Sequence, residues 1–174
     1  MNDDILERCQ EAIAYRFQNP ALLNAALTHA SVAANRLDSN ERLEFLGDAI
    51  MGMVICQYLF DQYPAYQEGD LTKIKSSVVS RKTCAQISDG LGLSKFLMLG
   101  NGISSRAKLP PSLPAAVFES LVAAIAIDGG LEQARLFILE QMVPYIEEAV
   151  ASEHQQNFKS QLQQHAQKEL GATP

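Results

Sequence analysis

The sequence predicts an all-α fold. Apolar residues recur at helical spacing along nearly the whole chain, whereas no segment keeps the strict apolar–polar alternation of a half-buried strand. Two segments are apolar on almost every side, a pattern typical of helices that other protein surrounds. With 174 residues, 47% of them hydrophobic, the chain can form a domain with a sizeable core. We expect one domain of about seven helices.

The first three helices are predicted from their spacing and their start signals. Residues 4–16 form an amphipathic helix, and a second helix begins after Asn19, which suits an N-cap. A long helix runs from residue 41 to about residue 60, with Ser39 or Asn40 able to cap it. Because this helix is apolar nearly all round, we expect its own domain or a partner chain to surround it.

Four more helices are expected in the second half of the chain. Residues 68–93 contain two of them. A loop of about fifteen residues, 100–114, follows, and loops this long in compact domains tend to be functional or mobile. A second apolar helix covers residues 115–130, and an amphipathic helix covers residues 131–150.

The composition of the chain limits its expected cellular location and the classes of partner that it can bind. The net charge of −6 argues against a broadly basic phosphate-binding surface but leaves room for local contacts to nucleic acid. No apolar run approaches the roughly 20 residues that span a bilayer, so we expect no membrane partner. The three cysteines are widely spaced and form no CxxC pair, which is typical of reduced, buried thiols. We therefore expect a cytoplasmic protein.

Three carboxylates gather at the start of the long helix, in the segment NERLEFLGDAI. Glu41, Glu44 and Asp48 fall within an arc about 60° wide on the helix. Like charges at this spacing repel, and burying an uncompensated carboxylate costs several kcal/mol. The helix N-terminus stabilises the first two carboxylates but does not reach Asp48. A divalent cation with oxygen ligands is the alternative source of compensation.

The second apolar helix supplies one further carboxylate, Glu119, which is alone among apolar neighbours. A metal ion shared with the carboxylates of the long helix would compensate its charge. Two helices that bring carboxylates together would suit metal-assisted hydrolysis of a phosphodiester. A salt bridge from Arg42, Lys73 or Lys75 is the alternative that the sequence leaves open.

Several segments resemble the ribonuclease III family, the endonucleases that cut double-stranded RNA. NERLEFLGDAI resembles the family's signature, and ALTHAS, EGDLTKIKSSVVS and AAVFESLVAAIAIDGG resemble further family segments in the family's order. The resemblance covers roughly residues 5–150. It implies that residues 1–150 form the helical endonuclease domain, with the signature on a long buried helix.

The resemblance also implies roles for the acidic residues. Glu44, Asp48 and Glu119 match metal ligands, and the last two match the catalytic pair. Glu41 and Glu68 match acidic residues that lie beside the metal ligands or along the catalytic valley. Mg²⁺ is the implied cofactor, with Mn²⁺ as a substitute.

A homodimer and an RNA product follow from the same resemblance. Phe45 matches an aromatic residue that inserts into the partner subunit, which implies a symmetric dimer whose two sites each cut one strand. The products would carry 5′-phosphate and 3′-hydroxyl ends with short 3′ overhangs, as in processing of ribosomal and messenger RNA. Arg106 and Lys108, in the long loop, are possible RNA contacts, with a solvated loop as the alternative.

The last residues resemble the start of another domain. Residues 157–174 are similar to the first helix of a double-stranded-RNA-binding domain, and residues 151–156 form a polar linker. Such a domain needs far more than these residues. We therefore expect a truncated chain or a fragment whose final segment is a helix or a frayed tail.

One position departs from the family pattern. The family usually has Asp three residues before the final catalytic Glu, whereas this chain has Ala116 there. Asp128 cannot replace it, since it lies nine residues beyond Glu119 on the opposite side of the helix. Either water fills the position and metal affinity falls, or the site is silent. We expect weakened but real activity, with a silent RNA-binding relative and a helical dimerisation scaffold as the alternatives.

Overall fold

The computed structural model describes residues 3–100 and 109–170, the last of them, from residue 153 on, as backbone only. Seven α-helices and two short 3-10 helices occur in this part, with no strand beyond an isolated bridge between Thr28 and Met98. The predicted all-α fold is confirmed. The elements are α1 (Asp3–Ala12), α2 (Pro20–Ala26), η1 (Arg36–Asp38), α3 (Glu41–Gln62), α4 (Glu68–Val78), α5 (Arg81–Gly90), η2 (Leu93–Lys95), α6 (Ser112–Gly129) and α7 (Leu131–Leu170).

Helix α2 starts at its predicted cap, whereas α3 begins after Asn40, whose side chain makes no capping hydrogen bond. Asn19 caps α2, because its side-chain oxygen accepts a hydrogen bond from the backbone N–H of Ala21 at 3.1 Å. Helix α1 is shorter than predicted and ends at Ala12. The chain reverses there, so that the backbone N–H of Phe17 donates to the buried side chain of Gln10 at 2.8 Å.

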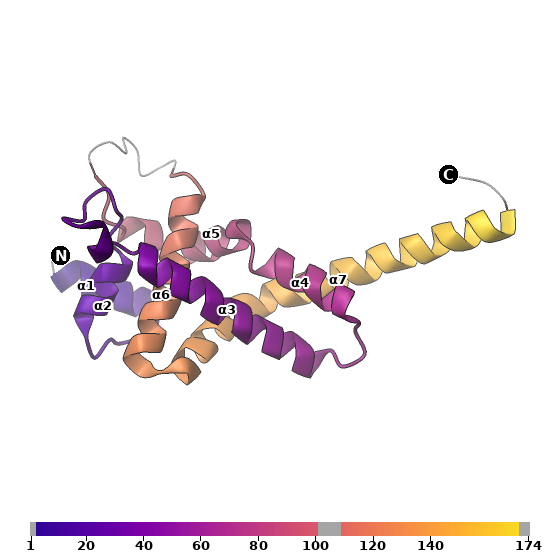
Figure 1. Cartoon of the computed structure of the whole chain (residues 1–174), viewed down its shortest axis with the longest axis horizontal. Helices are drawn as coiled ribbons and strands as arrows, with labels where there is room; N and C mark the ends of the chain where they lie inside the picture. Colours follow the sequence, from indigo (N-terminus) through magenta and orange to yellow (C-terminus); the bar gives the residue numbers. More distant parts are fainter. Residues whose placement is uncertain (1–2, 101–108, 171–174) are drawn as a thin grey trace.

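Helix α6 is the centre of the core. It crosses α3 and also packs on α5 and α7 (Figure 1). Its residues from Pro114 to Ile125 are buried except at Glu119, so α6 is surrounded by protein as its apolar sequence predicts. Helix α3 buries one side in the same core but leaves apolar residues exposed on the other. Its composition therefore reflects two different surfaces.

Among the described residues, α3 and α6 are long and apolar enough to cross a membrane, judged by length and composition alone. This corrects the expectation that no segment reaches that threshold. Both helices are this apolar because they pack against each other and supply much of the core.

Gly47 brings α3 and α6 together. A Cβ atom at this position would overlap the backbone carbonyl of Glu119, so a hydrogen atom is all that the contact admits. Glycine here therefore permits the short distance between the carboxylates of α3 and the helix that carries Glu119.

We expect Gly47→Ala to lower the free energy of unfolding by about 3 kcal/mol, because the backbone of α6 must move to accept the methyl group. Gly69 in α4 is the matched control, since a Cβ atom there meets nothing within 4 Å. Gly69→Ala should be neutral or stabilising by up to about 1 kcal/mol. Urea unfolding of both variants measures the difference, and equal small effects would contradict the close contact.

Helix α7 continues without a break from Leu131 to Leu170 and extends far from the other helices (Figure 1). Residues 151–156, predicted as a linker, are helical, as are residues 157–170. A polar segment can continue a helix that hydrophobic packing starts further upstream. The assignment of residues 157–174 to an RNA-binding domain stays a prediction.

Candidate active site

The carboxylates of α3 and α6 line one cavity of about 580 Å³, which we name the carboxylate cleft. Its walls are Glu41, Glu44, Phe45, Asp48, Val79, Arg81, Ser112, Ala115, Ala116 and Glu119. The structure thus brings together four of the predicted acidic residues from two helices far apart in the sequence. The roles assigned to them stay predictions.

Glu119 is the most perturbed carboxyl in the cleft. Burial raises its pKa, and the negative charges of Glu44 and Asp48 raise it further, to about 7. Burial and the neighbouring charge of Glu41 likewise raise the pKa of Glu44. The carboxylates therefore destabilise one another when all are ionised, and the cleft favours a bound proton or cation.

The oxygen donors of Glu44, Asp48 and Glu119 suit a hard divalent cation such as Mg²⁺. In the part of the chain that the structure describes, however, no three His, Cys, Asp or Glu side chains are arranged so that they could hold a metal ion. Mg²⁺ keeps several waters and needs few protein ligands. The residues fit such an ion by their chemistry, although they do not form a closed set of ligands.

Ala116 lies in the wall of the carboxylate cleft, where its methyl group offers no ligand. Its backbone carbonyl accepts a hydrogen bond from the Ser120 hydroxyl at 2.6 Å. Asp128 lies elsewhere and fixes the start of α2, because its carboxylate accepts from the backbone N–H groups of Gln18 and Asn19. Asp128 therefore does not replace the missing carboxylate.

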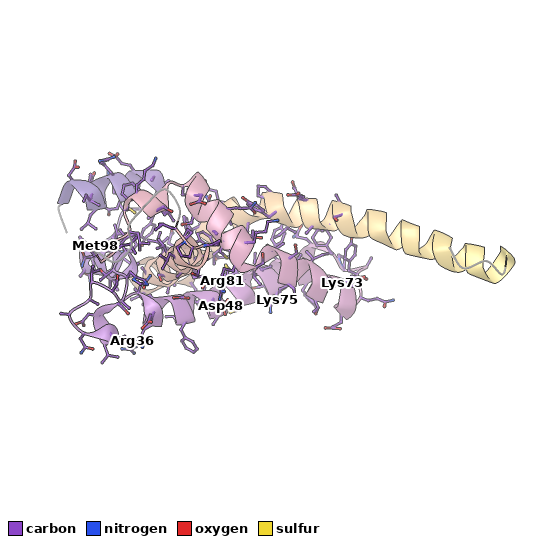
Figure 2. All side chains as sticks on the ribbon, turned by 90° about the horizontal axis from the view of Figure 1, so that it is seen from above. Arg36, Asp48, Lys73, Lys75, Arg81 and Met98 are labelled. Carbon is purple, nitrogen blue, oxygen red and sulfur yellow. The ribbon has the colours of Figure 1, made fainter. Side chains whose placement is uncertain are left out.

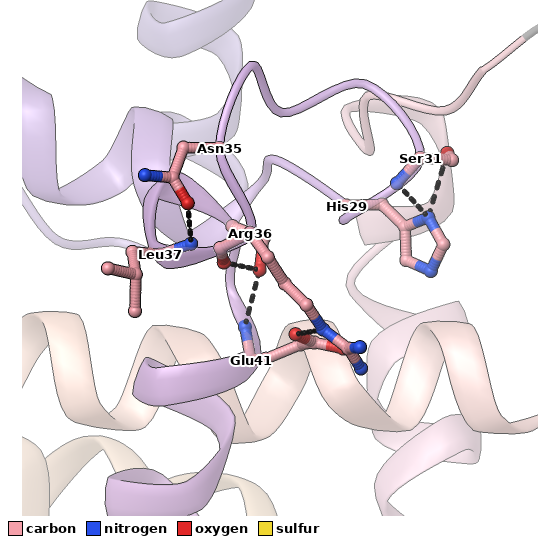
Figure 3. A network of polar contacts seen from close by, with 7 residues as sticks. His29, Ser31, Asn35, Arg36, Leu37 and Glu41 are labelled. Carbon is pink, nitrogen blue, oxygen red and sulfur yellow. Dashed lines mark hydrogen bonds and ion pairs between the residues drawn. The ribbon is translucent and has the colours of Figure 1, made fainter.

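Glu41 is held at the edge of the cleft by Arg36 (Figure 3). The Nε and Nη2 atoms of Arg36 donate to the two carboxylate oxygens at 2.6 and 2.8 Å. These hydrogen bonds lower the pKa of Glu41. Glu41 thus already has a cationic partner, which distinguishes it from the other carboxylates of α3. Arg36 was not predicted, since it lies in η1, a segment that the sequence indicated only as the connection before α3.

The basic residue in the carboxylate cleft is Arg81, at the start of α5. The sequence suggested Arg42, Lys73 or Lys75 as partners of Glu119, and none of these lines the cleft. Arg81 reaches the cleft through the tertiary fold, because the turn before α5 places it beside α3 and α6.

Cys84 lies beside Glu119 and was also missed. Its thiol is fully buried and donates a weak hydrogen bond to the sulfur of Met51 at 3.8 Å. Burial raises the pKa of Cys84 to about 12, so the thiol is neutral. Cys9 is buried in the same way, but Cys56 is exposed, which corrects the prediction that all three thiols are buried.

Glu68 lies outside the carboxylate cleft. It begins α4, accepts a hydrogen bond from the Thr72 hydroxyl at 2.7 Å and lines a separate cavity of about 520 Å³. We name this the apolar cavity. It is lined by Cys56, Leu59, Phe60, Tyr63, Pro64, Tyr66, Glu68, Leu71, Thr72 and Lys75. The two predicted RNA contacts of the long loop, Arg106 and Lys108, lie outside the described residues.

An exposed apolar stripe runs along α3, and we name it the α3 stripe. It consists of Phe45, Ala49, Met53, Cys56 and Phe60, which fall within an arc about 80° wide. Phe45 is 80% exposed and Phe60 is 72% exposed. Contiguous apolar residues this exposed mark interaction surfaces. The sequence predicted that either the chain's own domain or a partner chain surrounds this helix. A partner chain is the surrounding that suits the α3 stripe.

Comparison with known proteins identifies relatives over almost the whole chain. The model of a family described as ribonuclease-III-like matches residues 19–146. A protein named ribonuclease 3 from Rhodopirellula baltica is 50% identical over 97% of this chain. A protein of the same name from Bdellovibrio bacteriovorus is 36% identical over 100% of this chain. The chain spans 64% of the first relative's length and 76% of the second's.

A solved structure has the same fold. It is the nuclease domain of ribonuclease III from Campylobacter jejuni, described for its flexibility in a region involved in dimer formation. It matches with a TM-score of 0.74 and 33% identity, over 79% of this chain and 95% of that domain. The similarity thus extends from the sequence to the arrangement of the helices.

Proposed function

Because the chain belongs to the ribonuclease III family, we propose that it is an endonuclease that hydrolyses double-stranded RNA with the help of a divalent metal ion. The observation that carries the proposal is the convergence of Glu44, Asp48 and Glu119 on one cleft. Burial and neighbouring negative charges raise the pKa values of Glu44 and Glu119, which is costly to maintain, and cation-assisted chemistry explains this arrangement. RNA duplexes would be recognised by shape and backbone.

The residues of the carboxylate cleft divide the work. Glu44, Asp48 and Glu119 would hold Mg²⁺, or Mn²⁺ as a substitute, together with several of the ion's own waters rather than as a closed set of ligands. The bound metal would supply an activated water and stabilise charge on the phosphate oxygens. Without the metal, burial and its neighbours raise the pKa of Glu119 to about 7, and ligation of the cation would favour its ionised form. Asp48 completes the catalytic pair. The expected products have 5′-phosphate and 3′-hydroxyl ends.

The test is cleavage of a long RNA duplex by this chain, first with Mg²⁺ and then with Mn²⁺. We expect cutting to internal fragments that stops when EDTA is added, while single-stranded RNA of the same sequence is spared. Absence of cutting under both metals, with binding of the duplex retained, would instead establish the silent relative.

The alternative of a weakened or silent RNA-binding relative is favoured by one observation, the methyl group of Ala116 in the carboxylate cleft. A plain dimerisation scaffold is less economical, because it leaves the mutually perturbing carboxylates unexplained. A metal site should raise the melting temperature when Mg²⁺ is added, since the ion binds the folded chain. A scaffold predicts no such rise.

We also propose a symmetric homodimer built on the α3 stripe. Phe45 lies at one end of the stripe, and the apolar cavity lies at the other end, beside Phe60. If two copies of α3 pack antiparallel about a two-fold axis, each Phe45 meets the partner's apolar cavity. A cytoplasmic location and a role in processing ribosomal or messenger RNA belong to the same proposal.

Phe45→Ala should weaken dimerisation at least tenfold, because an exposed aromatic anchor loses its contact with the partner. The fold of the single chain should be unaffected, since the side chain is 80% exposed. Leu136→Ala, on α7 and away from the stripe, is the control because Leu136 is also exposed. Sedimentation velocity across a concentration series measures the effect, and equal dimer affinity in both variants would contradict this interface.

Cys56 reports on the same interface. It is the exposed thiol of the α3 stripe, whereas Cys9 and Cys84 are buried. We expect one thiol per chain to react quickly with a disulfide reagent at low protein concentration and more slowly as the dimer forms. Reaction that is independent of protein concentration, measured where sedimentation shows dimer, would place Cys56 outside the interface.

A further inference from the structure

Arg81 is the basic residue that lines the carboxylate cleft, and Figure 2 labels it close to Asp48. It is the first residue of α5. The preceding residue, Ser80, caps the helix, because its hydroxyl accepts a hydrogen bond from the backbone N–H of Thr83 at 3.3 Å. The cap fixes the backbone from which the Arg81 side chain extends.

Arg81 forms no ion pair within 4.0 Å in the described part of the chain, although it lies among acidic residues. Its charge acts on Glu44 and Glu119 only through space, lowering the pKa of each against the larger effect of burial. By contrast, Arg36 and Arg135 are each paired with a nearby glutamate. The guanidinium of Arg81 therefore keeps its donors available to a ligand.

The chemistry of Arg81 and of the cleft indicates a phosphate group as the ligand. A guanidinium presents a planar fork of N–H donors that matches two oxygens of a phosphate group. A phosphodiester entering the cleft would be repelled by the carboxylates, so a cation at the same place is needed to admit it. Ala116 lines the same cleft and offers Arg81 no carboxylate to pair with.

We propose that Arg81 binds the phosphate of the RNA at the cleavage site, through hydrogen bonds to its non-bridging oxygens. The proposal rests on the proposed function and adds a substrate-binding residue to it. The competing interpretation is that Arg81 only balances the charge of the carboxylates. In that case its removal changes the stability and pH dependence of the protein, but not the number of phosphates that the protein contacts.

The test uses the Glu119→Gln background, in which we expect RNA to be bound without being cut. Binding of a short fluorescent RNA duplex is measured at several KCl concentrations, with Arg81→Gln and Lys82→Gln compared. Lys82 is the matched control, because it is the next residue and carries the same charge but lines a different cavity, between α5 and α7. Arg81→Gln should weaken binding about tenfold and reduce the slope of log affinity against log salt by about one.

Lys82→Gln should leave both quantities close to those of the background. In the cleaving chain, Arg81→Gln should raise KM, and Arg81→Lys should recover part of the loss. Equal affinity and salt slope in the Arg81 and Lys82 variants, with cleavage intact in the parent, would overturn the role of Arg81 alone. Failure of the parent to bind or cut the duplex would overturn the proposed function together with it.

Discussion

Glu119→Gln is expected to abolish RNA cleavage while making the folded protein more stable at neutral and alkaline pH. The loss of activity should be about 10²–10⁴-fold, because the amide cannot accept a proton and is a weaker ligand for a cation. Replacing a residue that serves stability alone would instead destabilise the protein and leave the chemistry of cleavage intact. The two effects together therefore distinguish a functional carboxylate from a structural one.

The sign of the stability change comes from the pKa of Glu119. Its value is about 7 in the folded protein against 4.5 ordinarily, because burial and neighbouring carboxylates disfavour the ion. Between these pH values the folded chain keeps a proton that the unfolded chain has released. Stability from this group is thus complete below pH 4.5, falls as pH rises, and is lost above pH 7. Glutamine does not ionise, so the variant lacks this decline.

The size of the effect is set by the partial exposure of the carboxyl. A fully buried group with this change in pKa would contribute about 3 kcal/mol. Screening by solvent reduces the expected gain of Glu119→Gln at pH 8 to about 1–2 kcal/mol.

Urea unfolding at pH 5 and pH 8, in EDTA, measures this gain. Glu132→Gln is the control, because Glu132 forms an exposed ion pair with Arg135 that lowers its pKa. The control should show no gain at pH 8. A Glu119 variant whose advantage over the parent is the same at both pH values would contradict the assigned ionisation.

What the sequence could predict was whatever depends on spacing along one helix. The arc of Glu41, Glu44 and Asp48 follows from the helical repeat, and the structure has all three in one cleft. The cap at Asn19 was predictable for the same reason, since capping depends on neighbours in sequence. Glu119 was predictable as a site residue because it is the lone carboxylate among the apolar residues around it in its helix.

What it could not predict depends on contacts between segments. The approach of α3 to α6 at Gly47, and the arrival of Arg81 in the cleft, are products of packing that local patterns do not encode. The exposure of Cys56 was missed because apolar neighbours have the same periodicity whether they face a core or a partner chain. Glu68, assigned through a resemblance, lines a different cavity of this chain.

Ala116→Asp is the second large effect that we expect, and it addresses the departure from the family pattern. An aspartate there adds a fifth carboxylate to a cleft that already holds four, those of Glu41, Glu44, Asp48 and Glu119. Without metal the new charge should lower the free energy of unfolding by about 1–3 kcal/mol, because a largely buried carboxylate gains like-charged neighbours. It should also raise the pKa of Glu119 further.

With metal the same charge becomes favourable, since a hard cation gains an oxygen ligand. We expect the Mg²⁺ concentration for half-maximal cleavage to fall about tenfold, and the rise of melting temperature with Mg²⁺ to increase. Ala116→Asn is the matched control, because the amide has nearly the same size without the charge. Cleavage assays and thermal melts over a Mg²⁺ series compare the three chains.

The outcome separates the two interpretations of Ala116. If the parent cuts RNA and Ala116→Asp cuts it at lower Mg²⁺, the missing carboxylate limits metal affinity in a working enzyme. If only Ala116→Asp cuts, the fold and the other carboxylates are competent, and the methyl group alone silences the parent. No gain in either activity or metal-dependent stability would contradict the placing of the metal beside α6. The electrostatics of the cleft argue for a gain, because its carboxylates already raise the pKa values of Glu44 and Glu119 and a cation relieves that repulsion.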